Sequence, residues 1–244
     1  MSRSDGRTGD WLLGETVSIV IPALNESANL IHVLPRIPDW VRQVILVDDG
    51  STDGTADVAR QLMPHIEVVR NHRPRGKGNA LRTGFEHAQG SLVVQIDADG
   101  SEAPEEIIRF IAALLSGAEV AKGSRFISGG GTSDMTTVRK LGNRVFLLLC
   151  RLLYGVRWTD FCHGYIGFRA DAIPRLELDA SGFDIEAQIA LRAVDRGLAI
   201  CEVPCYEQAR VTGEGHLLTF RDGWRVLKTI VREKRRARKR RAGR

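Results

Sequence analysis

Short apolar runs alternate with amphipathic stretches over the first half of the chain. The apolar runs, rich in Val, Ile and Leu, lie at residues 17–22, 43–49, 66–70, 91–97 and 118–123. The stretches between them, which have helix-forming compositions, lie at residues 27–37, 53–63, 76–88 and 103–115. Strands that alternate with helices in this way are typical of βαβ units. The pattern therefore predicts an α/β fold with a parallel sheet over about the first 125 residues.

The pattern changes in the second half of the chain. Residues 127–137 are mostly Gly, Ser and Thr, which predicts a loop. A long loop beside a ligand-binding edge is more often a lid or an acceptor loop than a plain connector, and we expect the former. Residues 138–155 and 219–241 carry apolar side chains at spacings of three or four, which predicts two amphipathic helices.

Polar residues follow three of the predicted strands at the points where those strands end. They are Asn25 and Glu26, Asp48 and Asp49, and Asp97 and Asp99. Because ligands bind at the carboxyl ends of parallel strands, we expect these side chains to share one site. If the chain stays extended beyond Asp97, the two carboxylates of the last pair point the same way. Like charges so close together need a cation.

The nature of that cation follows from its ligands. Carboxylate oxygens are preferred by Mg²⁺ and Mn²⁺, which usually complete their coordination with waters and phosphate oxygens. Asp97 and Asp99 therefore predict a divalent metal that is bridged to a diphosphate.

Charge is distributed unevenly along the chain. From residue 228 to residue 244 there are ten Lys or Arg and one Glu, a local charge of +9, whereas the whole chain carries +5. The remaining residues therefore carry −4, the difference between the two values. A basic tail on an acidic body suggests a tether to a polyanion, either nucleic acid or an anionic membrane surface. A solvated tail without a partner is the alternative.

Other features of composition favour a cytoplasmic protein. The four cysteines show neither the spacing of a zinc site nor the density of a disulfide scaffold, so we expect reduced thiols. The N-terminal residues lack the apolar core of a secretory signal. The longest apolar run, residues 145–156, is interrupted by Arg151 and is shorter than the roughly 20 residues that span a bilayer. We therefore expect no membrane-crossing segment.

Four motifs occur in order along the chain: VSIVIPALNE, VILVDDGSTDGT, RGKGNALRTGF and the segment Asp97-Ala98-Asp99. With them the sequence resembles the family 2 nucleotide-sugar glycosyltransferases, and most closely the dolichyl- or polyprenyl-phosphate mannosyltransferase branch, over roughly residues 16–232. The resemblance implies a GT-A-like single nucleotide-binding α/β domain, with a mostly parallel mixed sheet flanked by helices and with C-terminal amphipathic helices. The expected organisation is a flexible N-terminus (1–15), the glycosyltransferase domain (16–215), and an amphipathic helix with a basic tail (216–244).

The resemblance also assigns roles on the donor side. The residues that would bind the donor nucleotide are Pro22, Leu24, Glu26, Asp48, Asp49, Lys77, Asp97 and Ala98. Asp97 and Asp99 would hold Mg²⁺ or Mn²⁺, and Arg210 would reach the donor diphosphate. This chain departs from the branch at Ser101, where relatives often have Gln, and at residues 213–216, which read Gly-Glu-Gly-His in place of Gly-x-Ser-Lys.

On the acceptor side, the resemblance implies that Arg125 and Arg139 hold the phosphate of a lipid. Such a phosphate is ionised near neutral pH, so it needs positioning by charge more than a general base. We therefore count Asp99, Arg125, Arg139 and Arg210 as catalytic. Asp160 matches an acidic position on the acceptor side. Glu186 lies either at the core end of its helix or beside the donor sugar.

These inferences predict a metal-dependent, inverting transferase. It would move a mannose- or glucose-type hexose from a GDP- or UDP-sugar to a polyprenyl phosphate, as a peripheral protein at the inner face of the membrane, held there by the basic tail. One alternative keeps the donor but uses a soluble acceptor. Another is a nucleotide- or nucleic-acid-binding module without transfer activity. Nucleic acid is not expected, because aromatic residues do not interrupt the basic run.

Overall fold

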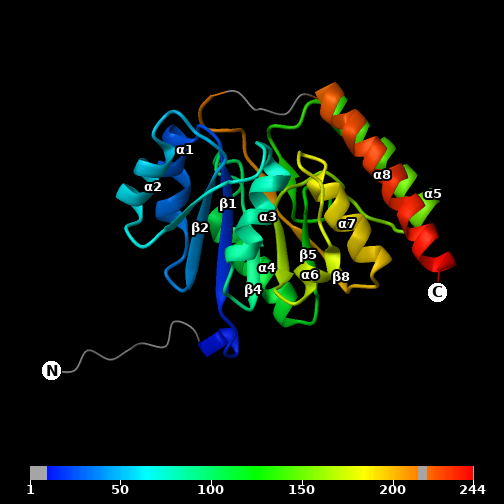
Figure 1. Ribbon diagram of the computed structural model, residues 1–244, viewed down its shortest axis with the longest axis horizontal. Coiled ribbons are helices and arrows are strands. Elements are labelled where there is room, and N and C mark those ends of the chain that lie inside the picture. Colours follow the sequence, from blue (N-terminus) through cyan, green and yellow to red (C-terminus); the bar gives the residue numbers. More distant parts are fainter. Residues whose placement is uncertain (1–9, 214–218, 244) are drawn as a thin grey trace.

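A seven-stranded mixed sheet forms the centre of the protein, which we describe from a computed structural model over residues 10–213 and 219–243 (Figure 1). The strand order is β3-β2-β1-β4-β7-β5-β8, and β7 runs antiparallel to both of its neighbours. The strands are β1 (Val17–Ala23), β2 (Gln43–Asp48), β3 (Glu67–Arg70), β4 (Leu92–Gln95), β5 (Val120–Ser124), β7 (Ile166–Arg169) and β8 (Ile200–Pro204). The predicted mixed α/β sheet is confirmed.

Helices cover both faces of this sheet because the strands are apolar on both sides. On one face, Ile19 and Ile21 of β1 pack in a cluster with residues of α1 (Ser27–Val33), α2 (Thr55–Leu62) and α4 (Ile107–Leu115). On the other face, Val20 packs in a cluster with residues of α3 (Lys77–His87), α6 (Ala172–Leu176) and α7 (Ile185–Asp195). Neighbouring residues of a strand point to opposite faces, so one short strand contributes to both layers.

Helices α5 (Thr137–Tyr154) and α8 (Thr219–Ala242) lie side by side at one end of the molecule (Figure 1). Phe146 and Cys150 of α5 share an apolar cluster with Val226 and Ile230 of α8. The Tyr154 hydroxyl donates to the carbonyl oxygen of Ile230 at 2.9 Å. Both predicted amphipathic helices are therefore present, and most of the expected basic tail belongs to a packed helix.

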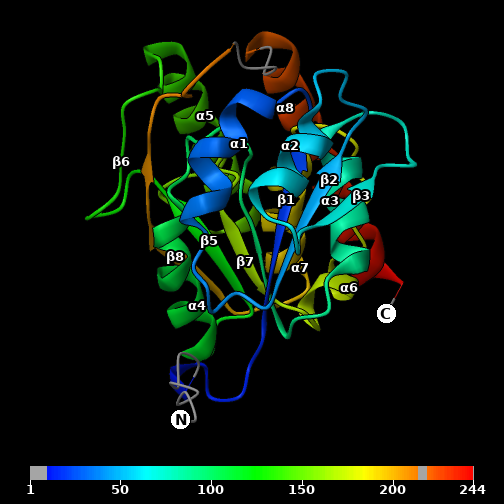
Figure 2. The ribbon, with the colours of Figure 1, turned by 90° about the vertical axis from the view of Figure 1, so that its left-hand side faces the viewer.

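Shorter elements complete the fold. The 3-10 turns are η1 (Asp10–Leu12), η2 (Leu34–Arg36) and η3 (Pro104–Glu106). A small parallel ribbon pairs β6 (Gly131–Thr132) with β9 (Tyr206–Glu207), so the predicted loop at 127–137 contains one short strand (Figure 2). Of the N-terminal segment that was expected to be flexible, the structure describes residues 10–15, in which Leu12 of η1 is buried in the core.

Three observations bear on the remaining expectations. All four cysteines are free. Across the described part of the chain, no helix combines the length and the apolar character that crossing a membrane would require. The extended backbone expected beyond Asp97 is absent, because β4 ends at Gln95 and a turn follows at residues 98–99.

Candidate active site

A cavity of about 810 Å³ opens at the carboxyl edge of β1, β2 and β4. It is lined by most of the residues that the sequence singled out, namely Pro22, Leu24, Glu26, Asp49, Lys77, Asp97, Ala98, Asp99, Arg139, Glu186 and Arg210. Asp48, Arg125 and Asp160 are not among its lining residues. The carboxyl ends of the strands thus bring together groups that lie far apart in the sequence.

Lys77 is the first residue of α3 and joins two carboxylates in this cavity. Its ammonium lies 2.7 Å from a carboxylate oxygen of Asp97 and 2.7 Å from Glu186 Oε1. Burial alone would lower the pKa of Lys77, but the charges of Asp97 and Glu186 raise it above its usual range. The helix begins against the loop at residue 181, where a side chain on Gly76, at φ 151°, would clash with the Ser181 carbonyl. Glu186 therefore lines the cavity, where it is paired with Lys77.

The carboxylate of Asp97 is held in a crowded acidic environment. Burial, together with the charges of Asp99 and Glu186, raises the pKa of Asp97 to about 6, against the opposing effect of Lys77. Glu102, which is 2% exposed, accepts a hydrogen bond from the Asp97 amide at 2.9 Å. Burial raises the pKa of Glu102 well above its usual range. Glu102 was not predicted as a site residue, although it stands only three residues after Asp99.

Arg210 contacts two other acids of the cavity, Glu26 and Asp99. Its guanidinium donates to Glu26 Oε1 at 2.5 Å and to Asp99 Oδ2 at 3.3 Å. The backbone around Arg210 is tied to the same loop, since the amide of Val211 donates to the carbonyl of Asp99 at 3.4 Å. Arg210 is thus in place to meet a diphosphate bound beside Asp99. The departures at Glu214–His216 lie outside the described residues.

Asp48 and Asp49 have different surroundings. Asp48 accepts from the amide of Ser51 at 2.8 Å and so closes the turn after β2. Asp49 lines the cavity and accepts from the amide of Gly76 at 2.8 Å and from Asn71 Nδ2 at 2.6 Å. Of the two, only Asp49 faces the space that a nucleotide would occupy.

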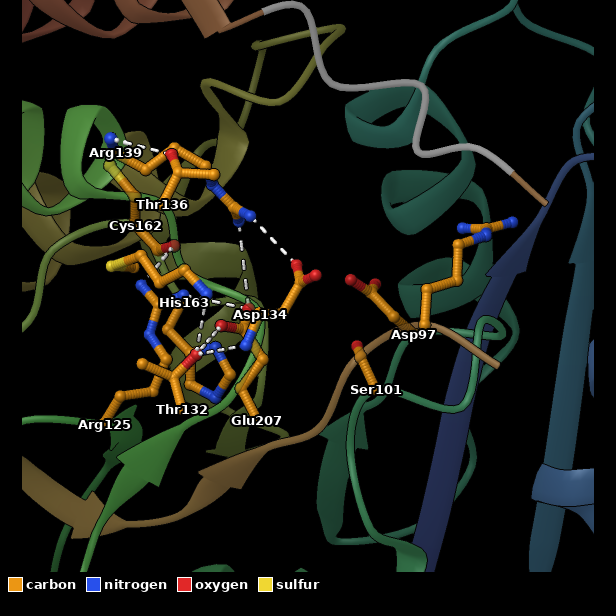
Figure 3. Close-up of polar contacts among 12 residues, drawn as sticks. Asp97, Ser101, Arg125, Thr132, Asp134, Thr136, Arg139, Cys162, His163 and Glu207 are labelled. Atoms are coloured by element: carbon orange, nitrogen blue, oxygen red, sulfur yellow. Dashed lines mark hydrogen bonds and ion pairs between the residues drawn. The ribbon is translucent and has the colours of Figure 1, made fainter. Parts of the chain in front are cut away.

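The residues that were expected on the acceptor side belong to a chain of alternating charges (Figure 3). Arg125, whose side chain is 1% exposed, donates to Asp160 Oδ2 at 2.7 Å and to Glu207 Oε1 at 2.9 Å. Hydrogen bonds from Arg125 lower the pKa of Asp160 against the opposing effect of burial. Arg139 follows next, with one guanidinium nitrogen 3.9 Å from Glu207 and the other 3.0 Å from Asp134.

This arrangement separates the two arginines that were expected to hold an acceptor phosphate. Arg139 lines the cavity and its side chain is 26% exposed. The guanidinium of Arg125, by contrast, already donates its hydrogen bonds to buried protein groups. In the structure, Arg125 and Asp160 support Glu207 and do not contact the cavity. Glu207 was missed because nothing in the local sequence of β9 distinguishes it from a surface acid.

The carboxylates of the cavity fit a divalent ion that is coordinated partly by the protein and partly by a bound phosphate compound. Among the described residues, no three His, Cys, Asp or Glu side chains are grouped so that they could hold a metal by themselves. Asp97 and Asp99 both line the cavity, and two carboxylates with phosphate oxygens and waters are a usual environment for Mg²⁺ or Mn²⁺.

Comparison with known proteins places the chain among glycosyltransferases. The model of glycosyl transferase family 2 matches residues 18–176. The chain belongs to this family. As a member of family 2 it is an enzyme, so the alternative of a binding module without transfer activity is excluded.

Two proteins that are similar to this family 2 enzyme have names that refer to a phosphorylated polyprenol. The chain is 33% identical to polyprenol monophosphomannose synthase of Mycolicibacterium smegmatis over 76% of this chain and 75% of that protein. It is also 33% identical to undecaprenyl-phosphate mannosyltransferase of Micrococcus luteus, over 82% and 87% of the two chains.

Among solved structures, glucosyl-3-phosphoglycerate synthase from Mycobacterium tuberculosis, in complex with Mn²⁺, UDP and its product, is similar to this family 2 enzyme. The TM-score is 0.73 at 26% identity, covering 96% of this chain and 86% of that one. The expected GT-A-like fold is thus confirmed.

Proposed function

We propose that this enzyme transfers a hexose from a nucleoside-diphosphate sugar to a polyprenyl phosphate, with inversion at the anomeric carbon and with Mg²⁺ or Mn²⁺ held by Asp97 and Asp99. The observation that carries the proposal is the arrangement of charge in one cavity. Arg210 lies beside Asp99, one of the two carboxylates that would hold the metal. Arg139 lines the same cavity but is paired with another acid, Asp134. The names of the mannosyltransferase relatives support a lipid phosphate as acceptor.

The chemistry needs charge more than a general base. An acceptor phosphate oxygen attacks the anomeric carbon, and the bond from that carbon to the donor diphosphate breaks as the new bond forms. Asp97 and Asp99 would hold the divalent cation, which would supply positive charge to the departing diphosphate. Arg210 donates hydrogen bonds to the same diphosphate, and Arg139 orients the attacking phosphate. Lys77 keeps Asp97 in place from the start of α3.

Helices α5 and α8 support action at a membrane surface. Both carry apolar side chains that are exposed at spacings of three, four or seven: Val138, Leu141, Val145, Leu148 and Leu152 on α5, and Phe220, Trp224 and Val231 on α8. Cations accompany them on α8, where Lys228, Arg232, Arg235 and Lys239 line a shallow groove with Trp224 and Val231. Apolar insertion and cationic attraction act together at anionic bilayers, so we place the enzyme peripherally at the cytoplasmic face.

A transfer assay tests the proposal. Purified enzyme is incubated with undecaprenyl phosphate in vesicles, one of GDP-mannose, UDP-glucose or their common analogues, and MnCl₂, MgCl₂ or EDTA. We expect one donor to give a glycolipid detected by mass spectrometry, and EDTA to abolish it. Absence of glycolipid with every donor in the presence of metal would refute the proposal. Flotation with vesicles that contain or lack phosphatidylglycerol tests the membrane contact separately.

A soluble phosphorylated acceptor is the second candidate. It is favoured by the solved neighbours, whose complexes contain phosphoglyceric acid or its glucosylated form. Adding phosphoglyceric acid to the same assay decides between them, because transfer to this soluble acceptor gives a product in the aqueous phase and leaves the vesicles without added sugar.

A further inference from the structure

Arg139 is held between two carboxylates that differ in their freedom to move. Glu207 lies 3.9 Å from its guanidinium, is itself 10% exposed in its side chain and accepts from Arg125 and Thr132. Asp134, 3.0 Å from the guanidinium, is 42% exposed. The buried carboxylate is fixed by two other donors, whereas the exposed one has Arg139 as its only side-chain partner within residues 10–213 and 219–243.

The backbone around Asp134 explains how this carboxylate reaches Arg139. The hydroxyl of Thr132 donates to Glu207 at 2.6 Å and accepts from the amides of Asp134 and Met135, each at 3.2 Å. The loop is therefore folded onto Glu207, and Asp134 projects from it toward Arg139 (Figure 3). Arg139 itself starts from α5, where its amide donates to the N-cap Thr136 at 3.3 Å.

Charge counting indicates which of these contacts must change when a phosphate binds. Asp160, Arg125, Glu207, Arg139 and Asp134 alternate in sign and together carry a net charge of −1, three carboxylates against two guanidinium groups. A phosphate monoester adds roughly −1.5 to −2 near neutral pH. Like charges around one guanidinium repel, so one carboxylate has to move away. Exposed Asp134 is free to move, whereas Glu207 is held by Arg125 and Thr132.

We propose that Asp134 occupies the position on Arg139 that the phosphate of the acceptor takes, and that it sets the selectivity of the site for strongly anionic acceptors. This exchange of the Asp134 carboxylate for a phosphate on Arg139 rests on the proposed function, in which the acceptor carries a phosphate. A weakly charged or neutral alcohol does not displace the carboxylate, whereas a phosphate monoester does. Glu207 keeps Arg139 in place throughout the exchange.

The test uses full-length enzyme with Asp134→Asn, which keeps the shape of the side chain but removes its charge. Asp57→Asn is the matched control, because Asp57 pairs with Arg60 at 3.2 Å on exposed α2, away from the cavity. Binding of geranyl phosphate, inorganic phosphate and neutral geraniol is measured by titration calorimetry, and KM for acceptor and donor is measured with undecaprenyl phosphate. Asp134→Glu serves as the conservative variant.

We expect Asp134→Asn to lower both the Kd for geranyl phosphate and the acceptor KM by about two- to fivefold, the range set by an exposed ion pair. The donor KM, the melting temperature and the control variant should stay unchanged, and Asp134→Glu should resemble the wild type. Improved binding cannot result from a damaged fold, which makes the direction informative.

Two results would overturn the exchange. One is unchanged or weaker phosphate binding in Asp134→Asn. The other is a kcat reduced by tenfold or more with the phosphate acceptor, which would assign the carboxylate to catalysis instead. If wild-type enzyme forms no glycolipid, the proposed function fails. The phosphate titrations still test whether Asp134 competes with phosphate for Arg139. If wild-type enzyme forms glycolipid but the variant binds phosphate like the wild type, only the exchange fails.

Discussion

Replacing Lys77 with Met tests whether the donor-side carboxylates depend on a buried cation. Met has similar length and no charge, so the change removes the contacts to Asp97 and Glu186, both 2.7 Å, with little loss of packing. The Lys77 side chain is 11% exposed and that of Glu186 is 9% exposed, so solvent compensates poorly. Breaking a buried pair from one side costs about 3–5 kcal/mol. For a domain of this size, that corresponds to a fall in melting temperature of roughly 6–20 °C.

The loss should depend on pH in a defined direction. The pKa of Asp97 is already about 6 in the folded enzyme, and without the positive charge of Lys77 it rises further. A carboxyl group whose folded pKa exceeds its unfolded value binds extra protons in the folded state, so stability falls as pH rises from about 4 through the raised pKa. The difference between wild type and Lys77→Met should therefore be larger at pH 8 than at pH 5.

Calorimetric melting at both pH values measures this effect. Arg36→Met is the control, since Arg36 pairs with Glu105 at 2.8 Å with both side chains more than one-third exposed, and such pairs contribute about 1 kcal/mol or less. A loss for Lys77→Met no larger than that of the control, or equal at pH 5 and pH 8, would refute the reasoning. Adding Glu186→Gln to Lys77→Met should recover part of the loss, because one stranded charge is removed.

Three further perturbations test other parts of the structure. Apparent Mn²⁺ affinity in the presence of UDP or GDP should fall as pH drops below about 6, because protons compete for Asp97, and titration calorimetry from pH 5 to 8 measures this. Arg125→Met should lower the free energy of unfolding by about 3–5 kcal/mol in denaturant melts, because Asp160 is left buried and unpaired. Gly84→Ala should cost about 1–3 kcal/mol in the same assay, because its new methyl group would press on Val20 in the core.

Each of these has a contradicting outcome. Constant Mn²⁺ affinity across the pH range would exclude Asp97 as a ligand that titrates. A stable Arg125→Met variant that fails to bind acceptor phosphate would restore Arg125 to the direct role implied by the family resemblance. An unchanged melt for Gly84→Ala would mean that α3 and β1 have room to separate.

The α/β organisation was predictable because periodic apolar runs reflect burial directly. The strands observed at Val17–Ala23 and Gln43–Asp48 match the predicted runs at residues 17–22 and 43–49 within a residue or so. Strand β7 (Ile166–Arg169) was not recognised as a strand, because it is only four residues long and lies beyond the alternating pattern of the first 125 residues. The predicted helix at 27–37 ends early at Val33 and continues as the turn Leu34–Arg36 around Pro35.

The gathering of several acids around one cavity was predictable for a related reason. Residues such as Glu26, Asp49 and Asp97 follow strands that end at one edge, so topology alone brings them together. The acceptor side was harder, because the partner of Arg125 is decided by tertiary contacts. Asp160 lies 35 residues away and Glu207 lies 82 residues away along the chain, and no local pattern links either of them to this arginine.

The position of Glu233 has a consequence for how α8 meets any charged surface. This acid accepts from Arg192 at 2.8 Å and from Gln188 at 3.0 Å, both on α7, and so fastens the middle of the basic segment to the body of the enzyme. A flexible basic segment could bind an anionic surface in many orientations. On a helix that is fixed to the enzyme, by contrast, the cations keep constant distances and directions relative to one another. Their attraction to an anionic surface therefore also favours one orientation of the enzyme on that surface.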